Sequence, residues 1–196
     1  MKQYLVSVVV ILISVTVFSQ QTNFDRFNKE RQKISQTGIK ILATYSAANI
    51  IYGSIASSQT TGSNKYFHEM NAIWNGITLG ITGIGFLTAK KEGTLSYGES
   101  LKKQQHIEKL FLFNAGLDVA YIAGGAYLKE RAKTTIKNPL RLKGYGESIM
   151  LQGVVLLLFD GIMYTIHNRH GILLNKMGEN IKLASTPNGI GFIVKL

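Results

Sequence analysis

Residues 110–128 read LFLFNAGLDVAYIAGGAYL and residues 149–166 read IMLQGVVLLLFDGIMYTI, with one aspartate near the middle of each run, Asp118 and Asp160. A helix needs about 20 apolar residues to cross a bilayer core about 30 Å thick. An acidic side chain at that depth is costly unless it faces a protein interior or a wet cavity. The two runs therefore predict membrane-spanning helices, and the two acids mark the place to look for a functional site.

Two further apolar runs, at residues 39–56 and 71–89, precede this pair and are diluted by Ser, Thr, Asn and Gly. Four such runs behind an export signal are hard to bury in a soluble domain of 196 residues. We therefore predict an all-α membrane protein, a four-transmembrane-helix bundle. A bundle of buried soluble helices is the alternative.

The N-terminal sequence is typical of a secretory signal peptide. A lysine at position 2 precedes an apolar run, and small residues, Val17 and Ser19, stand before Gln20. Residues 1–19 are therefore predicted to be a signal peptide. Residues 22–40 are polar and basic, with aromatic and aliphatic residues at helical spacing, and predict an amphipathic helix that is either interfacial or solvated.

Three segments follow from these patterns: the signal peptide, a membrane domain over residues 20–170, and a tail over residues 171–196. In the tail, alternating runs flank Pro187, Asn188 and Gly189, which predicts a short β-hairpin.

The export signal sets the predicted orientation in a bacterial inner membrane. It places the mature N-terminus and the tail in the periplasm, and residues 57–70 and 129–148 in the cytoplasm. The cluster of Lys and Arg in residues 129–143 agrees with the positive-inside rule, whereas the lysines of residues 90–109 oppose it. We give the export signal more weight than the loop charges.

Each predicted span has one polar face at helical spacing. In hydrocarbon such faces turn toward one another, because lipid offers no hydrogen-bond partner. Two interpretations stay open: a structural polar core that fixes helix register, or a site in which one of two neighbouring carboxyls holds a proton. The candidate residues of this polar core are Asn49, His68, Asn71, Asn75, Asn114, Asp118, Tyr121, Gln152, Asp160 and Tyr164.

Glycines at small-xxx-small spacing predict close helix packing in two of the spans. They are Gly76 and Gly80 in the second span, and Gly116 with Gly124 in the third.

Composition excludes several classes of site. The chain has no cysteine, so disulfides, thiolate zinc sites, iron–sulfur clusters and cysteine nucleophiles are ruled out. Its net charge of +11 resides between the apolar runs rather than on a basic helix interleaved with aromatics, so we predict no nucleic-acid binding. Residues 68–72 lack the second histidine of a zinc-protease motif, and no serine-nucleophile motif is present. We predict no metal, cofactor or catalytic residue.

Two groups of motifs carry a family resemblance. Residues 67–71 with Trp74 and Asn75, and residues 144–148 leading into 151–153 and then Phe159 with Asp160, resemble an uncharacterised multi-pass membrane family of Bacteroidetes-type bacteria. The resemblance covers most of the mature chain. It implies the membrane architecture and no established activity.

These patterns favour a non-enzymatic membrane protein, either an envelope component or a binder of a small ligand between its helices. The lipid bilayer is one expected partner, with envelope proteins or a small ligand as possible others. Two alternatives remain. One is a transporter or proton-coupled component that uses Asp118 and Asp160, and the other is a membrane enzyme or haem protein that uses histidines such as His106, His167 and His170.

Overall fold

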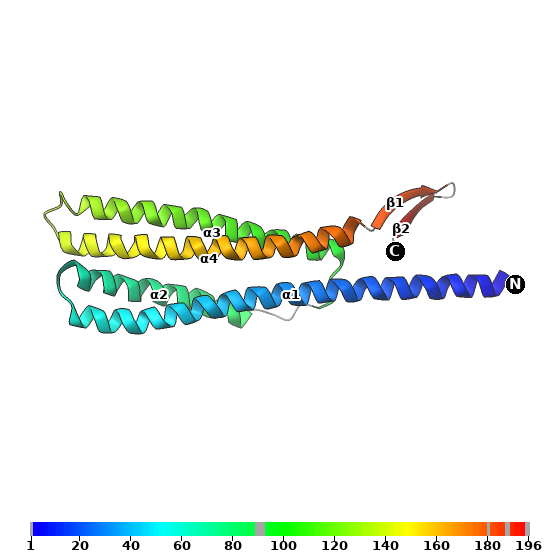
Figure 1. The fold of residues 1–196 in the computed structure, drawn as a ribbon, viewed down its shortest axis with the longest axis horizontal. Helices are drawn as coiled ribbons and strands as arrows, with labels where there is room; N and C mark the ends of the chain where they lie inside the picture. Colours follow the sequence, from blue (N-terminus) through cyan, green and yellow to red (C-terminus); the bar gives the residue numbers. More distant parts are fainter. Residues whose placement is uncertain (1, 89–92, 180, 187–188, 195–196) are drawn as a thin grey trace. The chain divides into compact units, whose positions relative to one another are not determined.

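Four long helices make up most of the chain in the computed structural model (Figure 1). The structure describes residues 2–88, 93–179, 181–186 and 189–194, with side chains for residues 23–88 and 93–178. The helices are α1 (Lys2–Gln59), α2 (Gly62–Thr88), α3 (Tyr97–Arg131) and α4 (Pro139–Glu179). Two strands follow, β1 (Ile181–Thr186) and β2 (Gly189–Val194), which pair antiparallel with Ile181 opposite Val194.

The chain divides into two compact units. The bundle unit comprises Ser35–Lys90 and Glu108–Thr165, and the terminal unit comprises Met1–Ile34, Lys91–Ile107 and Ile166–Leu196. Helices α1, α3 and α4 contribute residues to both units, whereas the described part of α2 belongs to the bundle unit alone.

The terminal unit has a small apolar core of the kind found in water-soluble proteins. Phe24 and Phe27 of α1 pack with Leu174 of α4, and all three side chains are buried. The ring centroids of Phe24 and Tyr97 lie 5.9 Å apart, which extends this core to the start of α3. The spacing of the two phenylalanines, three residues apart, places both on one face of α1.

In the bundle unit the four helices lie side by side as two hairpins, α1 with α2 and α3 with α4 (Figure 1). Backbones approach closely at glycines in these contacts. A Cβ built at Gly53 of α1 would lie 2.8 Å from the carbonyl oxygen of His68 in α2. A Cβ built at Gly125 of α3 would lie 2.6 Å from the carbonyl oxygen of Gly146 in α4. Only glycine allows either approach without moving a helix.

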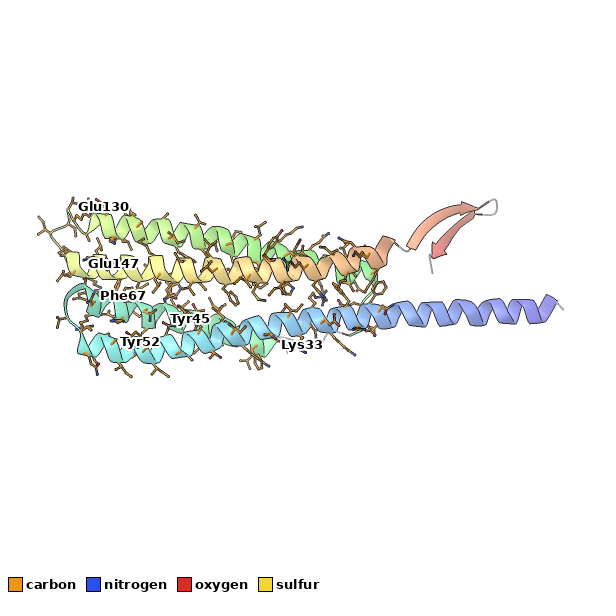
Figure 2. The ribbon with its side chains drawn as sticks, viewed as in Figure 1. Lys33, Tyr45, Tyr52, Phe67, Glu130 and Glu147 are labelled. Carbon is orange, nitrogen blue, oxygen red and sulfur yellow. The ribbon has the colours of Figure 1, made fainter. Side chains whose placement is uncertain are left out.

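Burial in the bundle unit is inverted relative to a soluble protein. Met163 is the only buried hydrophobic side chain among its described residues, and every other buried side chain reported for it is polar. Those buried polar residues are Ser46, Asn71, Asn75, Thr82, Asp118, Ser148, Gln152 and Asp160. Conversely, the exposed large apolar side chains all belong to this unit except Ile166, Ile172 and Leu173. Tyr52, labelled in Figure 2, is one of the exposed ones, at 62%.

The helices extend beyond the apolar runs at several of their ends. Helix α3 begins at Tyr97 rather than at residue 110, because Ser96 caps it: the backbone N–H of Ser96 donates to Glu99 Oε2 at 2.9 Å, and the N–H of Glu99 donates to Ser96 Oγ at 3.3 Å. These bonds to Ser96 also hold the pKa of Glu99 below its ordinary value. Hydropathy marks only the apolar part of a helix, so it missed this polar first turn.

Helix α4 also extends beyond its apolar run. It begins at Pro139, which suits a first helical position, after Asn138 with its positive φ of 57°. It runs on to Glu179, so residues 171–179, predicted to belong to the β tail, are helical. The buried Leu174 fixes this extension by packing against α1. The predicted turn residues Pro187 and Asn188 lie outside the described residues.

The small-xxx-small prediction was wrong in its choice of glycines. A Cβ at Gly76, Gly80, Gly116 or Gly124 would meet no atom within 4 Å. The glycines in tight contact include Gly53, Gly125, Gly146 and Gly153, and none of these lies four residues from another. The close helix contacts could therefore be located only in the tertiary structure.

Among the residues that the structure describes, two helices are long and apolar enough to cross a membrane. These are α3 and the part of α4 from Pro139 to Gly178.

Candidate functional site

Four amide side chains form a hydrogen-bonded network inside the bundle unit. Gln152 Nε2 of α4 donates to Asn71 Oδ1 of α2 at 2.5 Å, and Asn71 Nδ2 donates to Asn49 Oδ1 of α1 at 3.1 Å. Asn75 Nδ2 donates to the backbone oxygen of Asn71 at 2.8 Å. The network therefore joins three helices through Asn71.

Local helix geometry positions this network. Asn49 Nδ2 donates at 2.9 Å to the backbone oxygen of Tyr45, one turn earlier in α1, which orients the Asn49 side chain. The Tyr45 hydroxyl donates to Gln152 Oε1 at 3.4 Å. Residues four apart lie on one face of a helix, so α1 presents both side chains to α4 and α2.

Asp118 of α3 and Asp160 of α4 form a second polar group. The two residues are only 3% and 6% exposed, and their carboxyls lie close enough to interact with each other. Oδ2 of Asp118 is buried and has no hydrogen-bond donor among the described residues.

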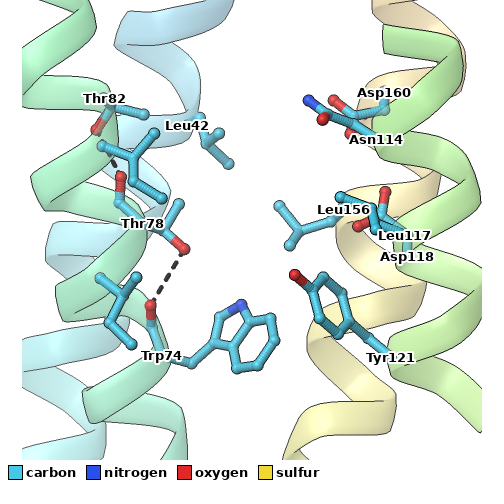
Figure 3. Close-up of a pocket in the computed structure, with 12 residues that line it drawn as sticks. Leu42, Trp74, Thr78, Thr82, Asn114, Leu117, Asp118, Tyr121, Leu156 and Asp160 are labelled. Carbon is cyan, nitrogen blue, oxygen red and sulfur yellow. Dashed lines mark hydrogen bonds between the residues drawn. The ribbon is translucent and has the colours of Figure 1, made fainter. Parts of the chain in front are cut away.

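A cavity of about 450 Å³ lies beside this acid pair (Figure 3). Asp118, Asp160 and Asn114 lie in the wall formed by α3 and α4, while the opposite wall comes from α2 and α1. Between the walls, the indole ring of Trp74 meets the ring of Tyr121 edge to face, with 4.8 Å between centroids. The remaining lining residues are Leu42, Ile77, Thr78, Ile81, Thr82, Leu117 and Leu156.

The structure divides the predicted polar core into two groups. Asn49, Asn71, Asn75 and Gln152 form the amide network. The second group, which lines the cavity, consists of Asn114, Asp118, Tyr121 and Asp160.

Two predicted residues fall in neither group. His68 is half-buried and packs edge to face against Tyr52, with 5.4 Å between ring centroids. Tyr164 is half-buried on α4. Helical spacing aligned both with the polar faces, but alignment within one helix does not show which neighbour a side chain meets.

Sequence reasoning missed the apolar part of the cavity. Trp74, Leu42 and Leu156 line it, and none differs in sequence from an ordinary core or lipid-facing residue. Tyr45 could have been added to the network, because it lies one turn before Asn49.

A separate cluster of buried polar side chains lies in the terminal unit. Gln104 Nε2 of α3 donates to the backbone oxygen of His167 in α4 at 2.6 Å. The ring of His170 stacks on that of Phe27, with 4.2 Å between centroids. Burial, followed by the nearby charges of His170 and Arg31, lowers the pKa of His167 to about 4.

Within the described residues, no group of three His, Asp or Glu side chains is arranged to hold a metal ion. His167 and His170 are buried in the terminal unit, and His106 is exposed on α3.

The bundle unit coincides closely with a known family. The model of a family of unknown function (DUF6992) matches residues 41–161, more than half of the chain. The chain belongs to this family. The DUF6992 region contains the whole amide network and both carboxyls, but not Tyr164. No curated protein and no solved structure matches the chain.

Proposed function

We propose that this DUF6992 protein is a multi-pass protein of the bacterial inner membrane, without enzymatic activity, whose bundle unit binds a small ligand or an envelope partner through its polar core. The observation that carries the proposal is the inverted burial of the bundle unit: polar side chains inside, large apolar side chains outside. Water penalises such an exterior, whereas lipid favours it.

The same burial pattern supports spans in α1 and α2, which are less apolar overall than α3 and α4. Ile41 and Ile51 of α1, and Ile73 and Ile84 of α2, are exposed, while the amides of these helices point inward. Mean hydropathy counts both faces of a helix, but lipid contacts only the outer face. We therefore propose four spans, at about residues 39–56, 71–89, 110–128 and 149–166.

The proposed topology follows from the export signal. Residues 1–19 act as a signal peptide, the domain over residues 20–170 carries the four spans, and the tail with β1 and β2 lies in the periplasm. The exposed basic residues between α3 and α4, including Lys133 and Lys137, then lie in the cytoplasm beside anionic headgroups.

Single cysteines test the spans cleanly, because the chain has none of its own. We expect Ile84→Cys, in intact cells or inverted vesicles, to resist a water-soluble maleimide and to react only after denaturation in detergent. Lys102→Cys, exposed on α3 in the terminal unit, is the matched control and should react from the periplasm. Lys133→Cys should react from the cytoplasmic side.

A soluble bundle gives the opposite result. Ile84 is 65% exposed, so its cysteine would then react as fast as that at Lys102, and carbonate washing would release the protein from membranes. If Lys133→Cys reacts from the periplasm, the proposed orientation is wrong, but the proposed spans are not refuted.

A second candidate function is a proton-coupled component. The burial of Asp118 and Asp160 side by side in one cavity wall favours it, because neighbouring carboxyls in a membrane interior can take up and exchange protons. Vesicles containing the protein should then dissipate an imposed pH gradient faster than vesicles with Asp160→Asn. Glu130→Gln, on the exposed end of α3 (Figure 2), is the control and should behave like the wild type. Equal rates for all three proteins would remove this function.

A further inference from the structure

The cavity beside Asp118 has an apolar mouth. Among its lining residues, Ile77 and Ile81 of α2 and Leu117 of α3 are also exposed on the outer surface of the bundle unit. If this surface faces lipid, as proposed above, the cavity opens sideways between α2 and α3 toward the acyl chains. A ligand would enter it from the bilayer rather than from water.

The polar wall of the cavity carries hydrogen-bond acceptors in excess. Asp118 and Asp160 lie in it, and no Lys, Arg or His lines the cavity within the described part of the chain. None of the described residues donates to Oδ2 of Asp118, although the residue is only 3% exposed. A buried acceptor without a donor is costly, so this oxygen favours a ligand that brings one.

The hydroxyls on the opposite wall do not supply the missing donor. Thr78 Oγ1 donates to the backbone oxygen of Trp74 at 3.1 Å, and Thr82 Oγ1 donates to that of Thr78 at 3.0 Å (Figure 3). Both hydroxyls have used their proton within α2. They leave only lone pairs for a ligand.

The aromatic pair favours a positive charge in the same place. Trp74 and Tyr121 both line the cavity, and their edge-to-face packing leaves ring faces available to it. Aromatic faces attract organic cations, most strongly when water is excluded. The described lining of the cavity thus combines two carboxyls and two aromatic rings and contains no basic side chain. Such a lining suits a ligand that carries a positive charge on an apolar body.

We propose that this cavity binds a membrane-soluble organic amine, with its ammonium group on Asp118 and Asp160 and its apolar body against Leu42, Leu156 and the isoleucines of α2. The inference rests on the proposed membrane location. The volume of about 450 Å³ lies within the range of about 300–1,000 Å³ typical of small-ligand sites. The ammonium N–H groups donate to the two carboxyls and supply the donor that Asp118 Oδ2 does not receive from the described residues.

Trp74 allows a direct test, because it is the only tryptophan of the chain and it lines the cavity. The full-length protein is placed in nanodiscs of zwitterionic phosphatidylcholine and titrated with dodecylamine. Dodecanol and dodecanoate, with the same chain and a neutral or negative headgroup, are the matched probes. We expect a saturable change in Trp74 fluorescence with the amine alone.

The acid pair is tested by the double variant Asp118→Asn with Asp160→Asn. We expect its apparent affinity for dodecylamine to fall by about tenfold or more, since hydrogen bonds to charged groups are lost. Glu130→Gln removes an exposed carboxyl at the C-terminal end of α3, outside the cavity, and should bind dodecylamine as the wild type does. If the double variant fails to accumulate, Leu156→Phe is tested in its place. This substitution narrows the cavity and keeps both acids, so we expect the fluorescence response to dodecylamine to be lost.

Three results would overturn the inference. One is an equal response to all three probes, which indicates partitioning into the lipid. Another is no response to dodecylamine, and the third is an unchanged response in Leu156→Phe and in the double variant. If any of these results is obtained while Ile84→Cys still resists the maleimide, the amine site is refuted and the proposed membrane location is not.

Discussion

Gly125→Ala offers the sharpest test of how α3 and α4 pack, because its neighbour Gly124 provides a matched control. A Cβ at Gly125 would lie 2.6 Å from the carbonyl oxygen of Gly146 and 2.7 Å from the backbone nitrogen of Met150. Both are backbone atoms, so a rotamer change cannot relieve the contact. A Cβ at Gly124 would meet nothing within 4 Å.

The two substitutions share one effect and differ in another. Alanine in place of glycine favours a helix by about 0.5–1 kcal/mol at either position. At Gly125 the helices must also separate by about 0.8 Å to reach an ordinary contact of 3.4 Å, and overpacking of this kind costs about 1–3 kcal/mol. We therefore expect Gly125→Ala to be less stable than Gly124→Ala by about 2 kcal/mol.

The assay is thermal unfolding in a mild detergent, followed by the fluorescence of Trp74. A difference of about 2 kcal/mol corresponds to a difference in midpoint of about 4–8 °C for a chain of this size. Gly146→Ala should resemble Gly125→Ala, because a Cβ there would lie 2.6 Å from the Gly125 carbonyl oxygen. Equal midpoints for Gly124→Ala and Gly125→Ala, or a higher one for Gly125→Ala, would refute the close approach of the two helices.

Three further predictions address the network, pH and the start of α3. Gln152→Leu should lower the unfolding midpoint at a cost of about 1 kcal/mol, because Asn71 Oδ1 loses the shorter of its two hydrogen bonds, at 2.5 Å, and keeps only the one from Asn75 Nδ2 at 3.2 Å; an unchanged midpoint would mean that the bond from Asn75 is sufficient. The folded protein should lose stability as the pH falls from about 6.5 to 4, because the unfolded chain binds a proton at His167 in that window and the folded chain does not. That loss is on the order of 2 kcal/mol after allowance for partial solvent screening, and denaturant titrations of His167→Asn should show a flatter pH profile. Ser96→Ala should speed hydrogen exchange of the first-turn amides of α3, such as that of Glu99, because the N-cap stabilises this turn by about 1 kcal/mol. Exchange at the wild-type rate would contradict the cap.

The helical fold was largely predictable from the sequence. Each of the four apolar runs falls on one of the four helices, in the same order, because the length and periodicity of an apolar pattern are local properties of the sequence. The ends were not predictable to the same degree. The capping box at Ser96 and the packing of Leu174 extend α3 and α4 through polar residues that hydropathy cannot recognise.

The candidate site was predictable in its residues and not in its arrangement. Helical spacing placed Asp118 and Asp160 on inward faces, and the structure buries both. Helical spacing could not show that Asn49 and Gln152 both bond to Asn71 rather than to the acids, because register between helices depends on contacts far apart in the chain. The glycines show the same limit: spacing selected Gly76 and Gly116, whereas close approach occurs at Gly53, Gly125 and Gly146.

The sequence by itself determined the period of each helix, its apolar and polar faces, and the presence of two acids in apolar surroundings. These properties are local, since they depend on residues within a few turns. Only the tertiary structure decided which polar faces meet, where a cavity remains beside Asp118, and which side of each helix lies outside. These depend on how four backbones fit together, and that fit is set by contacts between residues such as Gly125 and Gly146 that lie on different helices.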